Sequence, residues 1–137
     1  MYGNITASGN YSGSINSKIQ VGGSIKASQY FSTTNAVTAV GSTQGDGVAI
    51  PATSIVFIDG ADGTKAAVLP SAAATLVGLT LTVHNTAGSV LKVFPASGGQ
   101  ISPLSTNEAA SVPANTAMVV TVESGGRWIG YFTTIIT

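Results

Sequence analysis

Apolar and polar residues alternate strictly in the stretch 79–84. Leu79, Leu81 and Val83 occupy one set of alternate positions, and two threonines and His84 occupy the other. Successive side chains of a β-strand point to opposite faces of its sheet. The pattern therefore predicts a strand with Leu79, Leu81 and Val83 in a core and His84 facing outward.

Short apolar runs of this kind recur from Gly41 onward, and glycine, proline or asparagine separates them. They span 54–59, 65–69, 90–94, 110–112, 117–123 and 127–133. Gly60 to Gly63 lies between the first two runs, and we expect it to form a hairpin turn. Ser71 can cap one short helical turn that Gly78 ends.

Many short strands with regular turn signals are typical of a sandwich or a barrel. The strand pattern therefore predicts an all-β fold, and we expect an antiparallel β-sandwich of jelly-roll type with an extended N-terminal arm. Trp128 supplies the largest single apolar side chain, and we place it in the core with the residues of the alternating strand.

The first forty residues have a different texture, with roughly one large side chain in six residues. The segments 3–8, 9–14 and 23–28 share an order of glycine, polar, large apolar, polar, small and serine. Such a segment cannot close a core by itself, and similar short rungs recur in intertwined trimeric shafts. Chance similarity in a sequence rich in glycine and serine is the alternative. We expect an arm over residues 1–40 and a sandwich domain over residues 41–137.

Ionisable residues are scarce, which argues against an enzyme. The 137 residues include five Lys and Arg, five Asp and Glu, one His and no Cys. Active sites require clustered ionisable groups with perturbed pKa values. We therefore expect no catalytic, cofactor-binding or metal site. The net charge is zero and basic residues do not cluster, so we expect neither nucleic acid nor a membrane as a partner.

Three residues in this set are candidates for chemistry. His84 is the only base for neutral pH, but it lies on an outward strand position and no Gly-x-Ser-x-Gly nucleophile turn is present. Asp59 and Asp62 could hold Ca²⁺ or flank a sugar. Their loop lacks the further oxygen ligands of a calcium site, and turn formation is the simpler explanation.

The last strand carries three aromatic residues. Trp128, Tyr131 and Phe132 could form a platform on which a sugar ring stacks. Core packing is favoured for Trp128 and Phe132, because residues four apart on a strand share a face. The N-terminus lacks a basic segment followed by an apolar stretch, and no apolar run approaches the length of a membrane span. We therefore expect synthesis in the cytoplasm of a host cell.

Four segments together resemble a known module. They are Gly78 to Asn85, Leu91 to Ile101, Val112 to Ala117, and Gly126 to Trp128. They are similar to a β-rich module of structural proteins in tailed bacteriophages, which are capsid decoration or cement proteins and tail or head fibres. The similarity extends roughly from Thr53 to Tyr131. Its marks are an Asn that ends one strand, a Pro-Ala-Ser-Gly-Gly turn that ends the next, and a Trp near the end.

The resemblance implies a structural protein of the virion. The expected role is a capsid decoration protein that binds the outside of the head shell as a homotrimer and stabilises it. Its partners would be its own copies and the major capsid protein. The arm would hold the contact anchors, because aromatic residues dominate interface energetics; these anchors are Tyr2, Tyr11, Tyr30 and Phe31. The alternative is a fibre or adhesin module that binds a host receptor or glycan.

Overall fold

The computed structural model of the chain describes residues 32–134, which form ten strands and one short 3-10 turn. The expected anchors Tyr2, Tyr11, Tyr30 and Phe31 lie outside the described residues. The elements are β1 (Thr34–Thr38), β2 (Val48–Ala49), β3 (Ile55–Asp59), β4 (Ala66–Val68), η1 (Ala74–Leu76), β5 (Thr80–Asn85), β6 (Leu91–Phe94), β7 (Gln100–Ser102), β8 (Ala110–Val112), β9 (Thr116–Ser124) and β10 (Arg127–Thr134). Within residues 32–134 no helix is long and apolar enough to cross a membrane.

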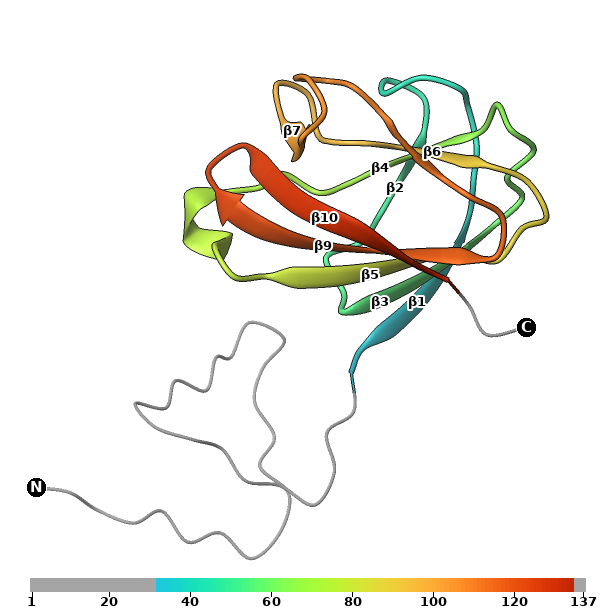
Figure 1. Cartoon of the computed structure of the whole chain (residues 1–137), viewed down its shortest axis with the longest axis horizontal. Coiled ribbons are helices and arrows are strands. Elements are labelled where there is room, and N and C mark those ends of the chain that lie inside the picture. The colour runs from blue at the N-terminus through green and yellow to red at the C-terminus, as the bar shows by residue number, and fades with distance from the viewer. Residues whose placement is uncertain (1–31, 135–137) are drawn as a thin grey trace, which may run out of the picture. The chain divides into compact units, whose positions relative to one another are not determined.

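The strands form two sheets. Sheet A has the order β1-β3-β5-β9-β10-β7, and sheet B has the order β2-β4-β6-β8. Figure 1 shows β1, β3, β5, β9 and β10 side by side in one layer, with β2, β4 and β6 in the other. The prediction of an all-β fold is confirmed, and two sheets enclose one apolar core.

The pairing of the strands differs from the prediction. Consecutive strands from β1 to β6 alternate between the sheets, so β1, β3 and β5 pair in parallel, as do β2, β4 and β6. Antiparallel pairing joins β5 to β9, β6 to β8 and β9 to β10. The expectation of an antiparallel sandwich is therefore wrong for the first six strands, and the jelly-roll type is not confirmed. Alternation indicates which face of a strand is buried, but it does not identify the neighbouring strand.

The segment Gly60 to Gly63 is a turn, but it does not close a hairpin. It leads from β3 in sheet A to β4 in sheet B. Gly60 and Gly63 have φ values of +70° and +93°, which favour glycine. The prediction of a hairpin is wrong because a crossing between sheets needs the same turn residues as a hairpin.

Asp62 stabilises this turn with its carboxylate. Its Oδ1 atom accepts hydrogen bonds from the Thr64 hydroxyl at 2.7 Å and from the backbone N–H groups of Thr64 and Lys65 at 2.9 and 3.1 Å. The hydroxyl of Thr64, followed by these N–H groups, lowers the pKa of Asp62 to about 2. The described contacts of Asp62 are thus those of a turn residue.

The sandwich extends into the first forty residues. Strand β1 pairs with β3 along its whole length, and Ala39 is buried in the core. Val40 forms an isolated bridge with Ala66 of β4. Residues 34–40 therefore contribute to the sheets, although the sequence pattern placed the domain boundary after them.

The core lies between the two sheets and is built from alternate strand residues. Leu81 and Val83 are fully buried, Trp128 is 1% exposed, and Leu79 is half-buried at the margin of the same cluster. Full burial of a leucine or valine side chain stabilises the fold by roughly 1.5–3 kcal/mol. Residues that sheet B contributes include Ala67, Leu91, Val93 and Val112.

Asn85, at the end of β5, is a fully buried polar side chain. Its Nδ2 donates to the carbonyl oxygens of Ser89, Val112 and Pro113 at 2.8, 3.1 and 2.9 Å. Its Oδ1 accepts from the N–H of Ala87 at 3.1 Å. This amide connects the end of β5 in sheet A to the loop before β6 and to the end of β8 in sheet B, which gives a physical reason for an Asn at this strand end.

Candidate functional site

The outer face of sheet A, on the side away from the core, is the candidate site. Its residues are the cross-strand neighbours in three rows, as the registers of β3, β5, β9 and β10 define them. We call them the outer face: Ile55, Phe57, Thr80, Thr82, His84, Ala117, Val119, Thr121, Ile129, Tyr131 and Thr133. Threonines and apolar residues thus cover the side of the sheet where an antiparallel sheet usually exposes charged residues.

On this side of β3, β5, β9 and β10, charged residues occur only outside the three rows, at the ends of the strands. Asp59 follows the last outer-face residue of β3, while Glu123 and Arg127 lie at the turn between β9 and β10. Arg127 Nε and a carboxylate oxygen of Glu123 are 2.9 Å apart, and both side chains are 44% exposed. An exposed pair of this kind contributes less than about 1 kcal/mol. Between these ends the outer face carries no Lys, Arg, Asp or Glu.

Large side chains on the outer face are exposed. Tyr131 is 65% exposed, Ile129 49% and Phe57 40%. The rings of Phe57 and His84 stack, with centroids 5.0 Å apart and an interplanar angle of 30°. Exposed apolar side chains that gather on one face are typical of an interaction surface.

His84 lies outward, and its cross-strand partners are Phe57 and Ala117. Neither neighbour has an ionisable side chain, so the register brings no acid or nucleophile directly beside the imidazole. Among residues 32–134, no group of three or more His, Asp or Glu residues could hold a metal ion. The contacts of His84 are those of an ordinary strand histidine on an aromatic surface.

A second feature is an apolar cavity between β10 and the loop after β7. Its volume is about 410 Å³. Met118, Gly130 and Phe132 line it from sheet A, while Pro103, Leu104 and Ala110 line it from the loop and sheet B. Phe132 is 50% exposed, so the cavity opens to solvent beside β10.

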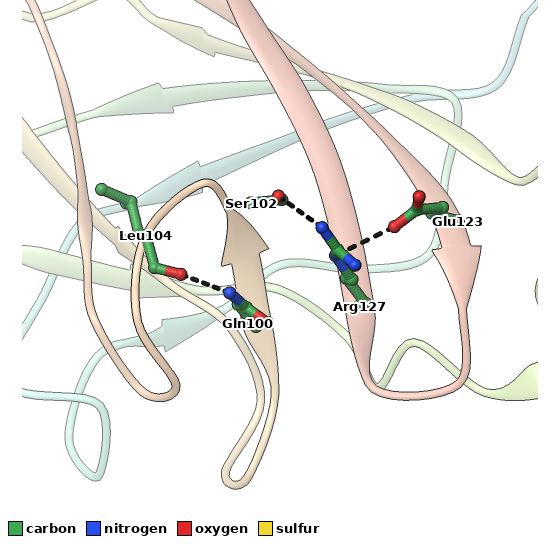
Figure 2. Close-up of polar contacts among 5 residues, drawn as sticks. All are labelled: Gln100, Ser102, Leu104, Glu123 and Arg127. Carbon is green, nitrogen blue, oxygen red and sulfur yellow. Dashed lines mark hydrogen bonds and ion pairs between the residues drawn. The ribbon is translucent and has the colours of Figure 1, made fainter.

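Polar contacts fix β7 and its loop against the start of β10 (Figure 2). Arg127 Nη2 donates to the Ser102 hydroxyl at 2.9 Å, and Gln100 Nε2 donates to the carbonyl of Leu104 at 2.6 Å. The Glu123 carboxylate approaches Arg127 from the opposite side. These bonds hold the cavity wall in a defined position. The sequence pattern did not predict this cavity.

The three aromatic residues of β10 do not form one platform. Trp128 lies in the core, Tyr131 on the outer face and Phe132 at the cavity. Phe132 shares the inner side with Trp128, as a spacing of four predicts, but it borders the cavity where β7 has ended. Core packing is thus confirmed for Trp128 and wrong for Phe132, which is 50% exposed. The three residues also do not form one sugar-stacking platform.

Asp46 is held like Asp62, in a loop away from the outer face. The Thr43 hydroxyl at 2.7 Å and the N–H groups of Thr43 and Ser42 at 2.7 and 2.9 Å all donate to its Oδ1. These bonds lower the pKa of Asp46 to about 2, with the hydroxyl of Thr43 as the largest cause. The two acids with a shifted pKa are thus ionised turn residues at neutral pH.

Comparison with protein-family models and with curated proteins finds no match for the chain. The outer face is therefore the main basis for a functional proposal. The sequence signal for the outer face was available, because Val119, Thr121, Ile129 and Tyr131 stand at alternate positions of two neighbouring apolar runs. Alternation alone did not show that these positions belong to the exposed side.

Proposed function

We propose that the chain is a structural protein of a tailed-bacteriophage particle, a decoration or cement protein that binds the outside of the head shell. The observation that carries the proposal is the neutral outer face, with Phe57, Ile129 and Tyr131 exposed on it. A sheet face without Lys, Arg, Asp or Glu suits adhesion through apolar burial and aromatic contacts. The resemblance of four segments to phage decoration and fibre modules supports the same class.

The proposed partners are the major capsid protein and other copies of the chain. In this proposal the copies form a homotrimer on the shell, and the residues before β1 serve as a contact arm with Tyr2, Tyr11, Tyr30 and Phe31 as anchors. Zero net charge supports close packing of copies, because it minimises their mutual repulsion. The outer face then provides the shell contact, and the arm extends it.

Binding to heads prepared without the chain tests the proposal. We expect the purified protein to co-sediment with such heads and to raise the temperature at which they release DNA. Tyr131→Lys places a charge at the most exposed large side chain of the outer face, and we expect it to weaken binding by at least about thirtyfold, as loss of an interface hot spot does. Ser97→Lys changes an exposed loop residue outside the outer face and is the matched control.

Two results would contradict the proposal. One is failure of the unaltered protein to co-sediment with the heads. The other is equal binding by the Tyr131→Lys and Ser97→Lys variants while circular dichroism shows both to be folded. Removal of residues 2–31 tests the arm separately and leaves β1 in place, because β1 begins at Thr34.

A fibre or adhesin module that binds a glycan is the second candidate. The stacked Phe57 and His84 rings, on the same face as the exposed Tyr131, favour it because sugars stack on exposed aromatic rings. Binding of the protein to a glycan array, lost in Phe57→Ala and retained in Ser97→Lys, would favour this candidate over shell attachment.

A further inference from the structure

The second half of β10 has an open edge. Strand β7 pairs with Arg127, Trp128 and Ile129 only. From Gly130 to Thr134, the described strands pair with β10 on the β9 side alone. Figure 1 shows β7 near the beginning of β10, which continues without it toward the C-terminus. An exposed edge of this kind presents unpaired backbone N–H and C=O groups and is a template for another strand.

The apolar cavity lies beside this open edge. Gly130 and Phe132 border the cavity from β10, on the side that faces between the sheets. A strand added in line with β7 would direct alternate side chains to the same side. Gly130 has no side chain to occupy the space, so the cavity can receive one or two apolar side chains from the added strand. Backbone pairing with side-chain pockets is how proteins bind an extended segment.

The chain itself contains a segment with the required pattern. Between residues 5 and 27, apolar side chains occur only at odd positions: Ile5, Ala7, Tyr11, Ile15, Ile19, Val21, Ile25 and Ala27. Even positions from 6 to 26 carry Thr, Ser, Asn, Gln, Lys or Gly. A period of two over this length is the pattern of extended strands with one apolar face. Ile19 and Val21 are the one pair of successive odd positions with two branched apolar side chains.

We propose that the segment Lys18 to Val21 of a neighbouring copy pairs with the open edge of β10 and inserts Ile19 and Val21 into the cavity. Lys18 and Gln20 would then face the outer side of sheet A, away from the cavity. Neither inserted side chain carries a charge, which suits a cavity whose lining is mainly apolar, although it includes Glu108. The proposal concerns assembly of copies, so it holds whether or not the assembled protein binds a phage head.

A neighbouring copy is favoured over the same copy because of where the segment joins the sheet. The segment precedes β1, which forms the edge of sheet A opposite to β7 and β10. Within one copy it would have to cross the strands β3, β5 and β9, a width of roughly 19 Å from β1 to β10. Between copies, the β1 edge of one sheet can approach the β10 edge of the next directly. Such a head-to-tail contact closes into a ring when the rotation permits.

Charge substitutions in the full chain test the insertion. Ile19→Asp with Val21→Asp should raise the dissociation constant of the oligomer at least about thirtyfold, as loss of an interface hot spot does. Asn16→Asp with Gln20→Asp adds the same charge at even positions and should leave the constant unchanged. On the receiving side, Phe132→Asp should act like the first pair, with Ser97→Asp, in an exposed loop outside the cavity and the outer face, as its control. Sedimentation velocity measures the constants, and equal behaviour of a variant and its control would overturn the proposal.

Photo-crosslinking gives a second measurement that does not depend on these variants. We place p-benzoylphenylalanine at position 132 and mix isotope-labelled with unlabelled full-length protein. Trypsin cleaves after Lys18 and Lys26, so residues 19–26 form one peptide. The proposal expects this peptide of one copy joined to residues 128–137 of another. A crosslink within one copy, or to a different peptide, overturns it, while loss of head binding with the crosslink retained contradicts only the proposed function.

Discussion

Replacement of Asn85 by leucine should destabilise the fold strongly, although leucine has a similar size and is more apolar. The amide of Asn85 donates to three backbone carbonyls and accepts from one N–H group, all at the buried end of β5. Leucine can make none of these bonds. Polar backbone groups around the site, such as the carbonyl of Val112, would then be left without the partner that they have in the fold.

The magnitude follows from the number of these bonds. Each hydrogen bond contributes about 0.5–1.5 kcal/mol net, and an orphaned buried group costs more. The three carbonyls share two N–H hydrogens, so the four contacts are worth fewer than four full bonds. We expect a loss of about 2–4 kcal/mol in the free energy of unfolding. Urea denaturation followed by Trp128 fluorescence measures it, with Asn35→Leu on the exposed strand β1 as the control.

Asn85→Asp sharpens the test through pH. A carboxylate at this position would face three carbonyl oxygens in a buried site, which raises its pKa above the ordinary value of about 3.9. A raised folded-state pKa means that the variant is most stable below about pH 3.9 and loses stability as pH rises through the folded pKa. The reasoning would be refuted if Asn85→Leu cost no more than Asn35→Leu, or if Asn85→Asp were equally stable at pH 4 and pH 7.

Three further predictions concern the core, a close contact and a turn. Trp128→Ala should cost roughly 3–5 kcal/mol in urea denaturation, and Trp128→Phe clearly less, because the buried Nε1 has no hydrogen-bond partner among residues 32–134. Gly130→Ala should destabilise by about 1–3 kcal/mol, since its Cβ would lie 2.7 Å from a methyl group of Val120, whereas Gly88→Ala meets nothing within 4 Å and should be neutral. The lowered pKa of Asp46 implies stability that is present above about pH 3.9 and is lost as pH falls toward 2, so Asp46→Asn should flatten the acid limb of a stability–pH curve.

The alternation of side chains made the buried faces predictable. Leu81 and Val83 stand at the inward positions that the pattern assigned. The expected helical turn occurs as η1 at Ala74–Leu76, but the predicted Ser71 cap is wrong, because Ala73 is the N-cap and makes no side-chain cap bond. A strand's pattern reports its own two faces, so this information is local. The choice of partner is not local, because Ile55 has Thr34 on one side and Thr82 on the other, both far away in sequence. Parallel winding therefore could not be predicted from turns and alternation.

The candidate site was predictable only in part. The scarcity of ionisable residues argued against an active site and in favour of a surface contact. The alternation in residues 79–84 predicted the outward side chains of β5. The exposure of Tyr131 and Ile129 depends on which side of sheet A packs against sheet B. Alternation along one strand does not reveal this tertiary property. The cavity depends on where β7 ends relative to β10, and its register with Arg127 and Ile129 is a tertiary property.

The alternation of strands between two sheets also determines how the chain can fold. Among the strands described, β9 and β10 are the one pair of sequence neighbours that are joined directly to each other. Every other ladder closes a long loop before its first contact forms, which places the chain with slow, high-contact-order folders in the millisecond-to-second range. During synthesis β9 and β10 leave the ribosome after the other described strands, yet β9 completes the central ladder with β5. Sheet A is therefore completed only when the last described strands are available, and the exposed edge of β5 depends on β9 for protection.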